Sequence, residues 1–172
     1  MSFLPPQEYY ASLPKHIASG AAIFHDPEGR FLLVKPSYRD TWELPGGGMD
    51  AGEYPLETAH REIREEIGLD VTLGRLLVID WVPPRPDGRP ALANFVFNGD
   101  ALINSEAQQR IRLQSDELTA WRMAGPQEWD TLLPPHTARR MRACADALAA
   151  GSTFYLEHGW HPGAARPLNG TS

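Results

Sequence analysis

The order of segments in this sequence predicts an α/β fold, an α+β arrangement in which a mixed sheet lies between helices. Two observations lead to this prediction. Segments with strand-like spacing lie on both sides of a helical segment, and further helical segments follow near the C-terminus. Hydrophobic residues make up 42% of the 172 residues, which is enough for the core of one domain.

The first strands are expected early in the chain. The first 14 residues contain three prolines and predict an irregular arm. Ile17–Phe24 and Phe31–Val34 are apolar runs separated by a turn that contains proline and glycine, so they predict a β-hairpin. Trp42–Pro45 predicts a short strand that ends at the three glycines 46–48.

The next segment has the spacing of a helix. From Pro55 onward, apolar residues recur so that one stripe contains Leu56, Ala59, Ile63 and Ile67. Proline suits the first turn of a helix, and Gly68 suits the position just after its end. Tyr54 would be an unusual N-cap residue.

The remaining segments complete the sheet and its outer layer. They predict strands at Val71–Val82, Ala91–Phe97 and Glu117–Met123, and helices at Pro126–Leu133 and Pro135–Ala149. A proline-rich loop, residues 83–90, joins the first two of these strands. We therefore expect an arm over residues 1–14, one domain over 15–150 and a C-terminal tail over 151–172, disordered from Pro162 onward.

Composition narrows the class of protein. Cys144 is the single cysteine, which excludes an internal disulfide framework and favours a reducing compartment. The N-terminus has no signal-peptide pattern, and no apolar run is long enough to span a membrane, so a soluble cytoplasmic protein is expected. The net charge of −6 disfavours nucleic-acid binding, although divalent cations would allow a phosphate ligand to bind.

Three carboxylates share one side of the predicted helix. Glu62, Glu65 and Glu66 fall within an arc of roughly 100° when residues advance by 100° each. Like charges at this spacing repel, so they need water or a cation. Mg²⁺ prefers oxygen ligands and is often shared between carboxylates and substrate phosphates. The helix therefore predicts a metal-assisted hydrolysis of a diphosphate linkage.

The alternative is a solvated acidic face balanced by Arg61 and Arg64. A longer pattern weighs against it. Nine positions at fixed spacing resemble the Nudix box, and they are Gly47, Glu53, Arg61, Glu62, Ile63, Glu65, Glu66, Gly68 and Leu69. With residue frequencies of several per cent each, such a match arises by chance on the order of once in a billion starting points.

The resemblance implies the Nudix fold, an α/β/α sandwich, over residues 15–150, and the lead-in Leu44–Gly47 is also typical of the family. It implies that Mg²⁺, with Mn²⁺ as a substitute, is bound by the box glutamates and the carbonyl of Gly47. Glu62 is the first candidate to assist the attacking water. Arg61 and Glu53 are expected to hold helix and loop in register.

A further acidic residue outside the box is expected to complete the site. Glu117, just before a predicted strand, is the preferred candidate, so the expected catalytic set is Glu62, Glu65, Glu66 and Glu117. Asp116 and Glu106 are weaker candidates. The alternative for Glu117 is an ordinary surface carboxylate.

The substrate is less defined by the sequence. Lys35 and Arg39 are candidates for phosphate contacts, with surface charge as the alternative. Trp42, Trp81 and Phe95 are candidates for stacking on a base or lining the cleft, with a core role as the alternative.

Two substrate classes are expected for a nucleoside diphosphate derivative: a nucleoside triphosphate, or a nucleotide sugar such as ADP-ribose. Pro84 lies near the offset typical of the ADP-ribose-cleaving branch, but three more prolines share its loop. The alternative functions are a catalytically silent Nudix-fold sensor module and an RNA-decapping role. A homodimer is possible, and neither a membrane nor a nucleic acid is an expected partner.

Overall fold

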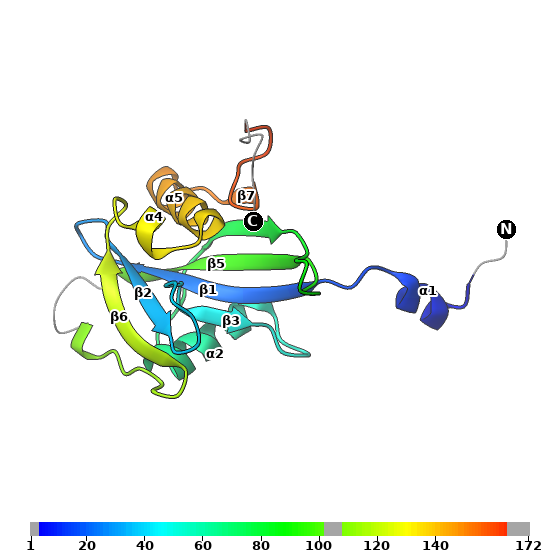
Figure 1. Ribbon diagram of the computed structural model, residues 1–172, viewed down its shortest axis with the longest axis horizontal. Helices are drawn as coiled ribbons and strands as arrows, with labels where there is room; N and C mark the ends of the chain where they lie inside the picture. Colours follow the sequence, from blue (N-terminus) through cyan, green and yellow to red (C-terminus); the bar gives the residue numbers. More distant parts are fainter. Residues whose placement is uncertain (1–3, 102–107, 165–172) are drawn as a thin grey trace.

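The computed structural model describes residues 4–101 and 108–164. In this part of the chain, a seven-stranded mixed sheet has the order β6-β2-β1-β5-β4-β7, and β3 pairs with β1 beside this path. Helix α2 covers one face of the sheet, and α4 and α5 cover the other (Figure 1). The α/β/α sandwich that the sequence predicts is confirmed.

The strands pair in both directions. β1 (Ile17–His25) forms the expected antiparallel hairpin with β2 (Phe31–Pro36), and it pairs in parallel with β5 (Leu92–Ala101). β4 (Leu76–Val82) runs antiparallel to β5. β6 (Leu118–Ala124) runs antiparallel to β2 and confirms the strand expected there.

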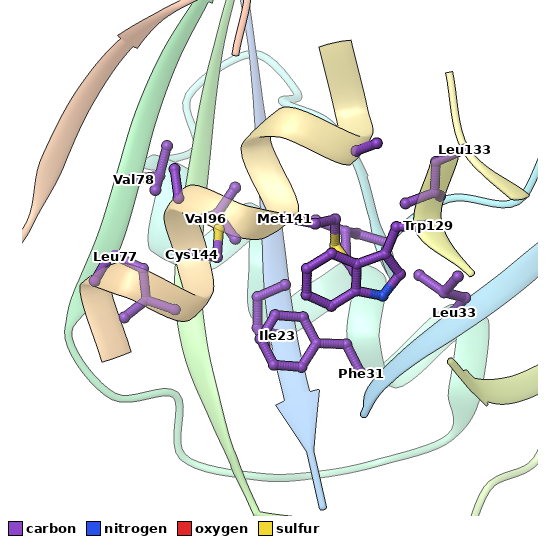
Figure 2. Close-up of a cluster of buried hydrophobic side chains, with 14 of the residues drawn as sticks. Ile23, Phe31, Leu33, Leu77, Val78, Val96, Trp129, Leu133, Met141 and Cys144 are labelled. Atoms are coloured by element: carbon purple, nitrogen blue, oxygen red, sulfur yellow. The ribbon is translucent and has the colours of Figure 1, made fainter. Parts of the chain in front are cut away.

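Two hydrophobic cores hold the layers together. On one face, α4 (Trp129–Leu132) and α5 (Pro135–Ala150) pack on the sheet, and Figure 2 shows Trp129 and Met141 against Phe31 and Ile23. The indole N–H of Trp129 donates to the carbonyl of Ala124 at 3.0 Å, so this large side chain is buried without an unsatisfied donor.

The second core lies between the opposite face and α2 (Pro55–Ile67). Ala59, Ile63 and Ile67 of the helix pack there against Phe24 and Leu32 of the sheet. Alternation of side chains along β1 and β2 supplies both cores, because successive residues of a strand point to opposite faces.

Three predicted boundaries are wrong. The strand expected at Trp42–Pro45 lies instead at the glycines themselves, β3 (Gly46–Gly48), and Glu43 makes only an isolated bridge to Val34. A Cβ at Gly46 would lie 2.5 Å from the Cα of Ala21, so only glycine lets β3 approach β1 this closely. The strand expected from Val71 begins at Leu76, and the helix expected over Pro126–Leu133 is the single turn of α4.

Both ends of the chain also differ from the prediction. The arm expected to be irregular contains a short helix, α1 (Pro6–Ser12), which buries none of its residues and stands away from the sheet (Figure 1). Part of the expected tail forms β7 (Phe154–Glu157), which pairs in parallel with β4. No helix in the described ranges is long and apolar enough to cross a membrane.

Candidate functional site

Helix α2 carries the box glutamates, and its ends follow the sequence signals. Pro55 is the first helical residue, and Tyr54 is the N-cap without a capping bond from its own side chain. Glu57 Oε2 instead accepts the backbone N–H of Tyr54 at 2.9 Å. Gly68 ends the helix at φ 67°, and its N–H donates to the carbonyl of Arg64 at 3.1 Å.

The buried face of α2 differs from the predicted stripe at one position. Leu56 is 39% exposed, whereas Thr58 is fully buried. A Cβ on Gly20 of β1 would lie 2.7 Å from the backbone nitrogen of Ala59 and 3.1 Å from the Cβ of Thr58. The first turn therefore rests directly on the backbone of β1, and Thr58 rather than Leu56 faces the sheet.

Arg61 joins the helix to the loop before it. Its Nε and Nη2 donate to the two carboxylate oxygens of Glu53 at 2.7 and 3.0 Å, and Nη2 also donates to the carbonyl of Gly48 at 3.0 Å. Its Nη1 donates to Glu62 at 2.8 Å and to Glu65 at 3.2 Å. One cation thus serves three carboxylates. The hydrogen bonds from Arg61 hold the pKa of Glu53 at about 2.

Glu66 is the most buried of the three box carboxylates. It is 6% exposed, and its Oε2 accepts the backbone N–H of Gly46 at 2.7 Å. Burial raises the pKa of Glu66 to about 8, and the charges of Glu62, Glu43 and Glu117 add to this rise. Glu66 therefore sits among negative groups that would all favour a cation nearby.

Glu62 lies against the glycine strand. A Cβ on Gly47 would lie 2.5 Å from the Cδ and Oε1 of Glu62, so this carboxylate occupies the space that a side chain at position 47 would fill. Burial raises the pKa of Glu62, while the hydrogen bond from Arg61 opposes the rise. The negative charges of Glu65 and Glu117 raise the pKa of Glu62 further.

Glu117 lies close to the same group. The N–H of Ser37 donates to the carbonyl of Glu117 at 2.8 Å, which fixes it beside the end of β2, and its charge acts on both Glu62 and Glu66. Both Glu117 and its weaker alternative, Asp116, are exposed. The other alternative, Glu106, lies outside the described residues.

Glu43 is a neighbour of the site that the sequence analysis missed. Its charge raises the pKa of Glu66, and burial raises its own pKa. Arg39 forms an ion pair with Glu43 at 3.1 Å, and its positive charge partly offsets this rise in pKa. The signal was present in the sequence, since Glu43 directly precedes the lead-in Leu44–Gly47.

The donors around Glu62 and Glu66 suit a hard cation. They are carboxylate oxygens, and the carbonyl of Gly48 on the glycine strand shares Arg61 with them. Within the described ranges, no three His, Cys, Asp or Glu side chains are grouped so as to hold a metal ion as they stand. Arg61 instead engages Glu62 and Glu65, so a cation would compete with it for these oxygens.

The candidate substrate contacts have other partners. Trp42 packs against the core under α5, and Phe95 packs against the core under α2, as their alternative role describes. Trp81 meets the ring of His16 edge-on at 4.9 Å. Lys35 donates to the carbonyl of Asp40. Their roles in substrate binding stay predictions.

Comparison with known proteins adds a family assignment. Residues 14–145 match the model of the NUDIX domain. An RNA pyrophosphohydrolase from Halorhodospira halophila is 45% identical over 47 residues, which cover 27% of this chain and 26% of that protein. The chain thus matches about a quarter of the length of this curated relative.

Two solved structures share the fold. The MutT protein from Methanosarcina mazei Go1 superposes with a TM-score of 0.62 at 22% identity, covering 81% of this chain and 99% of its own. A UDP-X diphosphatase superposes with a TM-score of 0.66 at 19% identity, covering 90% of this chain and 76% of its own. At 22% and 19% identity, these similarities show a shared fold and nothing finer.

Proposed function

Because the chain belongs to the Nudix hydrolase family, we propose that it cleaves a phosphoanhydride bond of a nucleoside diphosphate linked to another group, with Mg²⁺ as cofactor. The observation that carries this proposal is the placement of Glu62 and Glu66. Both are turned against the glycine strand β3, and burial among like charges raises the pKa of each. Such a group is stabilised by a bound cation.

We assign the metal to Glu62, Glu65, Glu66 and the carbonyl of Gly47. A phosphate substrate would otherwise meet a protein with a net charge of −6, so the cation also removes this repulsion. When bound, Mg²⁺ would polarise the phosphoryl oxygens and help to activate a water molecule.

The side chains have separate roles in this proposal. Glu62 accepts the proton of the attacking water from its place against the glycine strand β3. Glu117 adds negative charge to the same group from the turn just before β6. Arg61 and Glu53 are positioning residues, since their paired hydrogen bonds tie α2 to the preceding loop.

The substrate class is a nucleoside triphosphate or a nucleotide sugar such as ADP-ribose. A test panel therefore includes nucleoside triphosphates and ADP-ribose, together with UDP-linked substrates and RNA, which the names of two relatives add. The products identify the bond. A triphosphate would give a monophosphate and pyrophosphate, whereas ADP-ribose would give AMP and ribose 5-phosphate.

The decisive experiment measures Mg²⁺-dependent hydrolysis of this panel by the wild-type protein and by Glu62→Gln, Glu65→Gln and Glu66→Gln. Each substitution should lower kcat/KM by roughly 10²- to 10⁴-fold on the best substrate. Glu57→Gln is the matched control, because Glu57 is exposed on the same helix and glutamine can still accept the N–H of Tyr54.

Two results would contradict the proposal. Unchanged hydrolysis by all three variants would show that the box glutamates do not carry the reaction. Binding of nucleotides without turnover of any substrate by the wild-type protein would favour the silent sensor module instead. The proposal also includes a homodimer and a cytoplasmic location.

A further inference from the structure

Tyr38 is an aromatic side chain that stands open to solvent in the loop between β2 and β3. It is 69% exposed, and only Tyr54 is more exposed among the large hydrophobic side chains of the described residues. The guanidinium of Arg39 lies over its ring, 4.9 Å from the centroid, and Arg39 Nη2 donates to the hydroxyl of Tyr38 at 3.0 Å. Arg39 therefore occupies one face of the ring, and the opposite face is open.

Two contacts hold the loop that carries Tyr38. The N–H of Ser37 donates to the carbonyl of Glu117 at 2.8 Å, which ties the start of the loop to the turn before β6. Lys35 Nζ donates to the carbonyl of Asp40 and braces the loop from the other side of Tyr38. The ring is thus presented from a segment that is anchored both before and after it.

The same loop connects Tyr38 to the proposed metal site. Arg39 Nη1 forms an ion pair with Glu43 at 3.1 Å. The N–H of Gly46, three residues further along the chain, donates to Glu66 at 2.7 Å, and the charge of Glu43 acts on Glu66. Tyr38 therefore lies one arginine side chain beyond a carboxylate that neighbours the box glutamates.

We propose that Tyr38 is the platform on which the base of the nucleoside diphosphate stacks, on the ring face opposite Arg39. This inference rests on the proposed function, because it takes the diphosphate to be held by the metal at the box glutamates. Outward from that metal the protein presents carboxylate, arginine and aromatic ring, and the substrate presents phosphate, ribose and base in the same order.

Stacking also defines the class of base that this position would favour. Every base has a π face, so an aromatic side chain accepts all of them, with preferences set by the strength of stacking. A purine overlaps more of a tyrosine ring than a pyrimidine does. The cation behind the ring keeps it in one orientation through cation–π contact and the hydrogen bond to its hydroxyl. We therefore expect purine nucleotides to bind more tightly than pyrimidine nucleotides.

The first test measures binding by calorimetry with saturating Mg²⁺. One probe is α,β-methylene-ADP, which has no P–O–P bond to hydrolyse, and the other is methylenediphosphonate, the same group without its nucleoside. The wild type should bind the nucleotide more tightly. Tyr38→Ala should weaken binding of the nucleotide by roughly 10- to 100-fold, the loss expected for one stacked base, and leave binding of methylenediphosphonate unchanged. The loss for α,β-methylene-UDP should be smaller.

Three further variants separate stacking from a structural role of the loop. Tyr38→Phe keeps the ring and removes the hydroxyl that Arg39 contacts, so it should bind the nucleotide as the wild type does. Tyr38→Leu keeps an apolar side chain without a flat face and should behave as Tyr38→Ala does. Tyr155→Ala is the matched control, since Tyr155 is 49% exposed on β7, at the opposite edge of the sheet from β6.

Proton NMR of the bound probe reports stacking directly. The adenine H2 and H8 resonances of α,β-methylene-ADP should move upfield with the wild type and with Tyr38→Phe, because the ring current shields protons above an aromatic face. With Tyr38→Ala this upfield shift should be lost.

Three results would overturn the inference. They are equal affinity of the wild type for the two adenine-containing and base-free probes, a contribution of the base that survives in Tyr38→Ala, and one that is lost in Tyr38→Phe. Neither probe is cleaved, so a wild type without turnover would contradict the proposed hydrolysis and leave this test intact. Normal hydrolysis together with an unchanged base contribution in Tyr38→Ala would contradict the stacking alone.

Discussion

Two arginines on opposite faces of the sheet each organise carboxylates, but their charge balance and burial differ. Arg140 of α5 donates to Asp80 of β4 at 2.7 Å, and this pair is almost completely buried. The backbone N–H of Gly159 donates a hydrogen bond to the other carboxylate oxygen of Asp80 at 2.9 Å. Arg61 of α2 is a quarter exposed and donates to three carboxylates at once.

This difference in charge balance and burial distinguishes a structural ion pair from a candidate functional site. Asp80 and Arg140 compensate each other one to one, and burial keeps the neighbouring His136 neutral by lowering its pKa to about 4. Arg139 also lies near Asp80, so this group carries no excess of negative charge. Around Arg61 the negative charge exceeds the positive charge, so a bound cation would complete its compensation. Excess charge at a partly exposed position, rather than the presence of ion pairs, marks the candidate site.

Removing each arginine should give the largest contrast in stability. Arg140→Met leaves Asp80 buried without its cation, which should cost about 3–5 kcal/mol of unfolding free energy and lower Tm by about 10 °C. Arg61→Met should cost less, about 1 kcal/mol, because the three carboxylates it leaves are 15–54% exposed, whereas Asp80 is fully buried. Thermal unfolding without Mg²⁺ measures both.

The activities should rank in the opposite order. Well below its Tm, Arg140→Met should keep the wild-type kcat, whereas Arg61→Met should lose activity since it frees the loop from α2. Equal losses of stability in the two variants would remove the distinction between the networks. Normal hydrolysis by Arg61→Met would remove the positioning role of Arg61.

The sequence predicts the network around Arg61 better than the pair formed by Asp80 and Arg140. Glu53, Arg61 and the box glutamates lie within one short segment, so their spacing alone brings them together. Asp80 and Arg140 are 60 residues apart, and no local pattern pairs a strand carboxylate with a distant helix. The residues just after β7 are bound to this buried pair, because the N–H of Gly159 donates to Asp80 and Arg139 donates to the carbonyl of His158. These contacts explain why part of the predicted tail belongs to the sheet.

The two errors inside the predicted site come from contacts that lie outside the local sequence. The stripe placed Leu56 in the core because periodicity treats all turns of a helix alike. The backbone contact with Gly20 at the first turn instead selects Thr58. Glu43 was missed because it precedes the box in sequence, although the bridge between Glu43 and Val34 returns it to the side of Glu66. Both errors depend on contacts between segments rather than on spacing within one.

A methyl group on the glycine strand should give an effect of intermediate size. Gly47→Ala would place its Cβ where the carboxylate of Glu62 now lies, and this flexible side chain would turn away. We expect kcat to fall by roughly 10- to 100-fold, as for a misplaced catalytic group, with Tm little changed. Gly48→Ala is the control, because a Cβ there meets nothing within 4 Å. Similar kinetics for both variants would contradict the close contact between Gly47 and Glu62.

The smallest effect should appear in the pH dependence of stability without metal. Burial raises the pKa of Glu66 from 4.5 to about 8, so the folded protein retains this proton over a range where the unfolded chain releases it. The stability that the proton supports is complete below about pH 4.5 and is lost as pH rises through 8.

Glu66→Gln keeps position 66 neutral, so in EDTA its Tm should fall less than that of the wild type between pH 5 and pH 8. The gap should widen by several degrees, since each unit of pH between the two pKa values changes the unfolding free energy of the wild type by about 1.4 kcal/mol. Glu57→Gln, exposed on the same helix, should follow the wild type. Addition of Mg²⁺ at pH 8 should raise the Tm of the wild type but not that of Glu66→Gln, because only the charged carboxylate can bind the ion. Parallel curves for Glu66→Gln and the wild type would mean that Glu66 is already charged at neutral pH, and that the excess negative charge of this face is compensated without a metal.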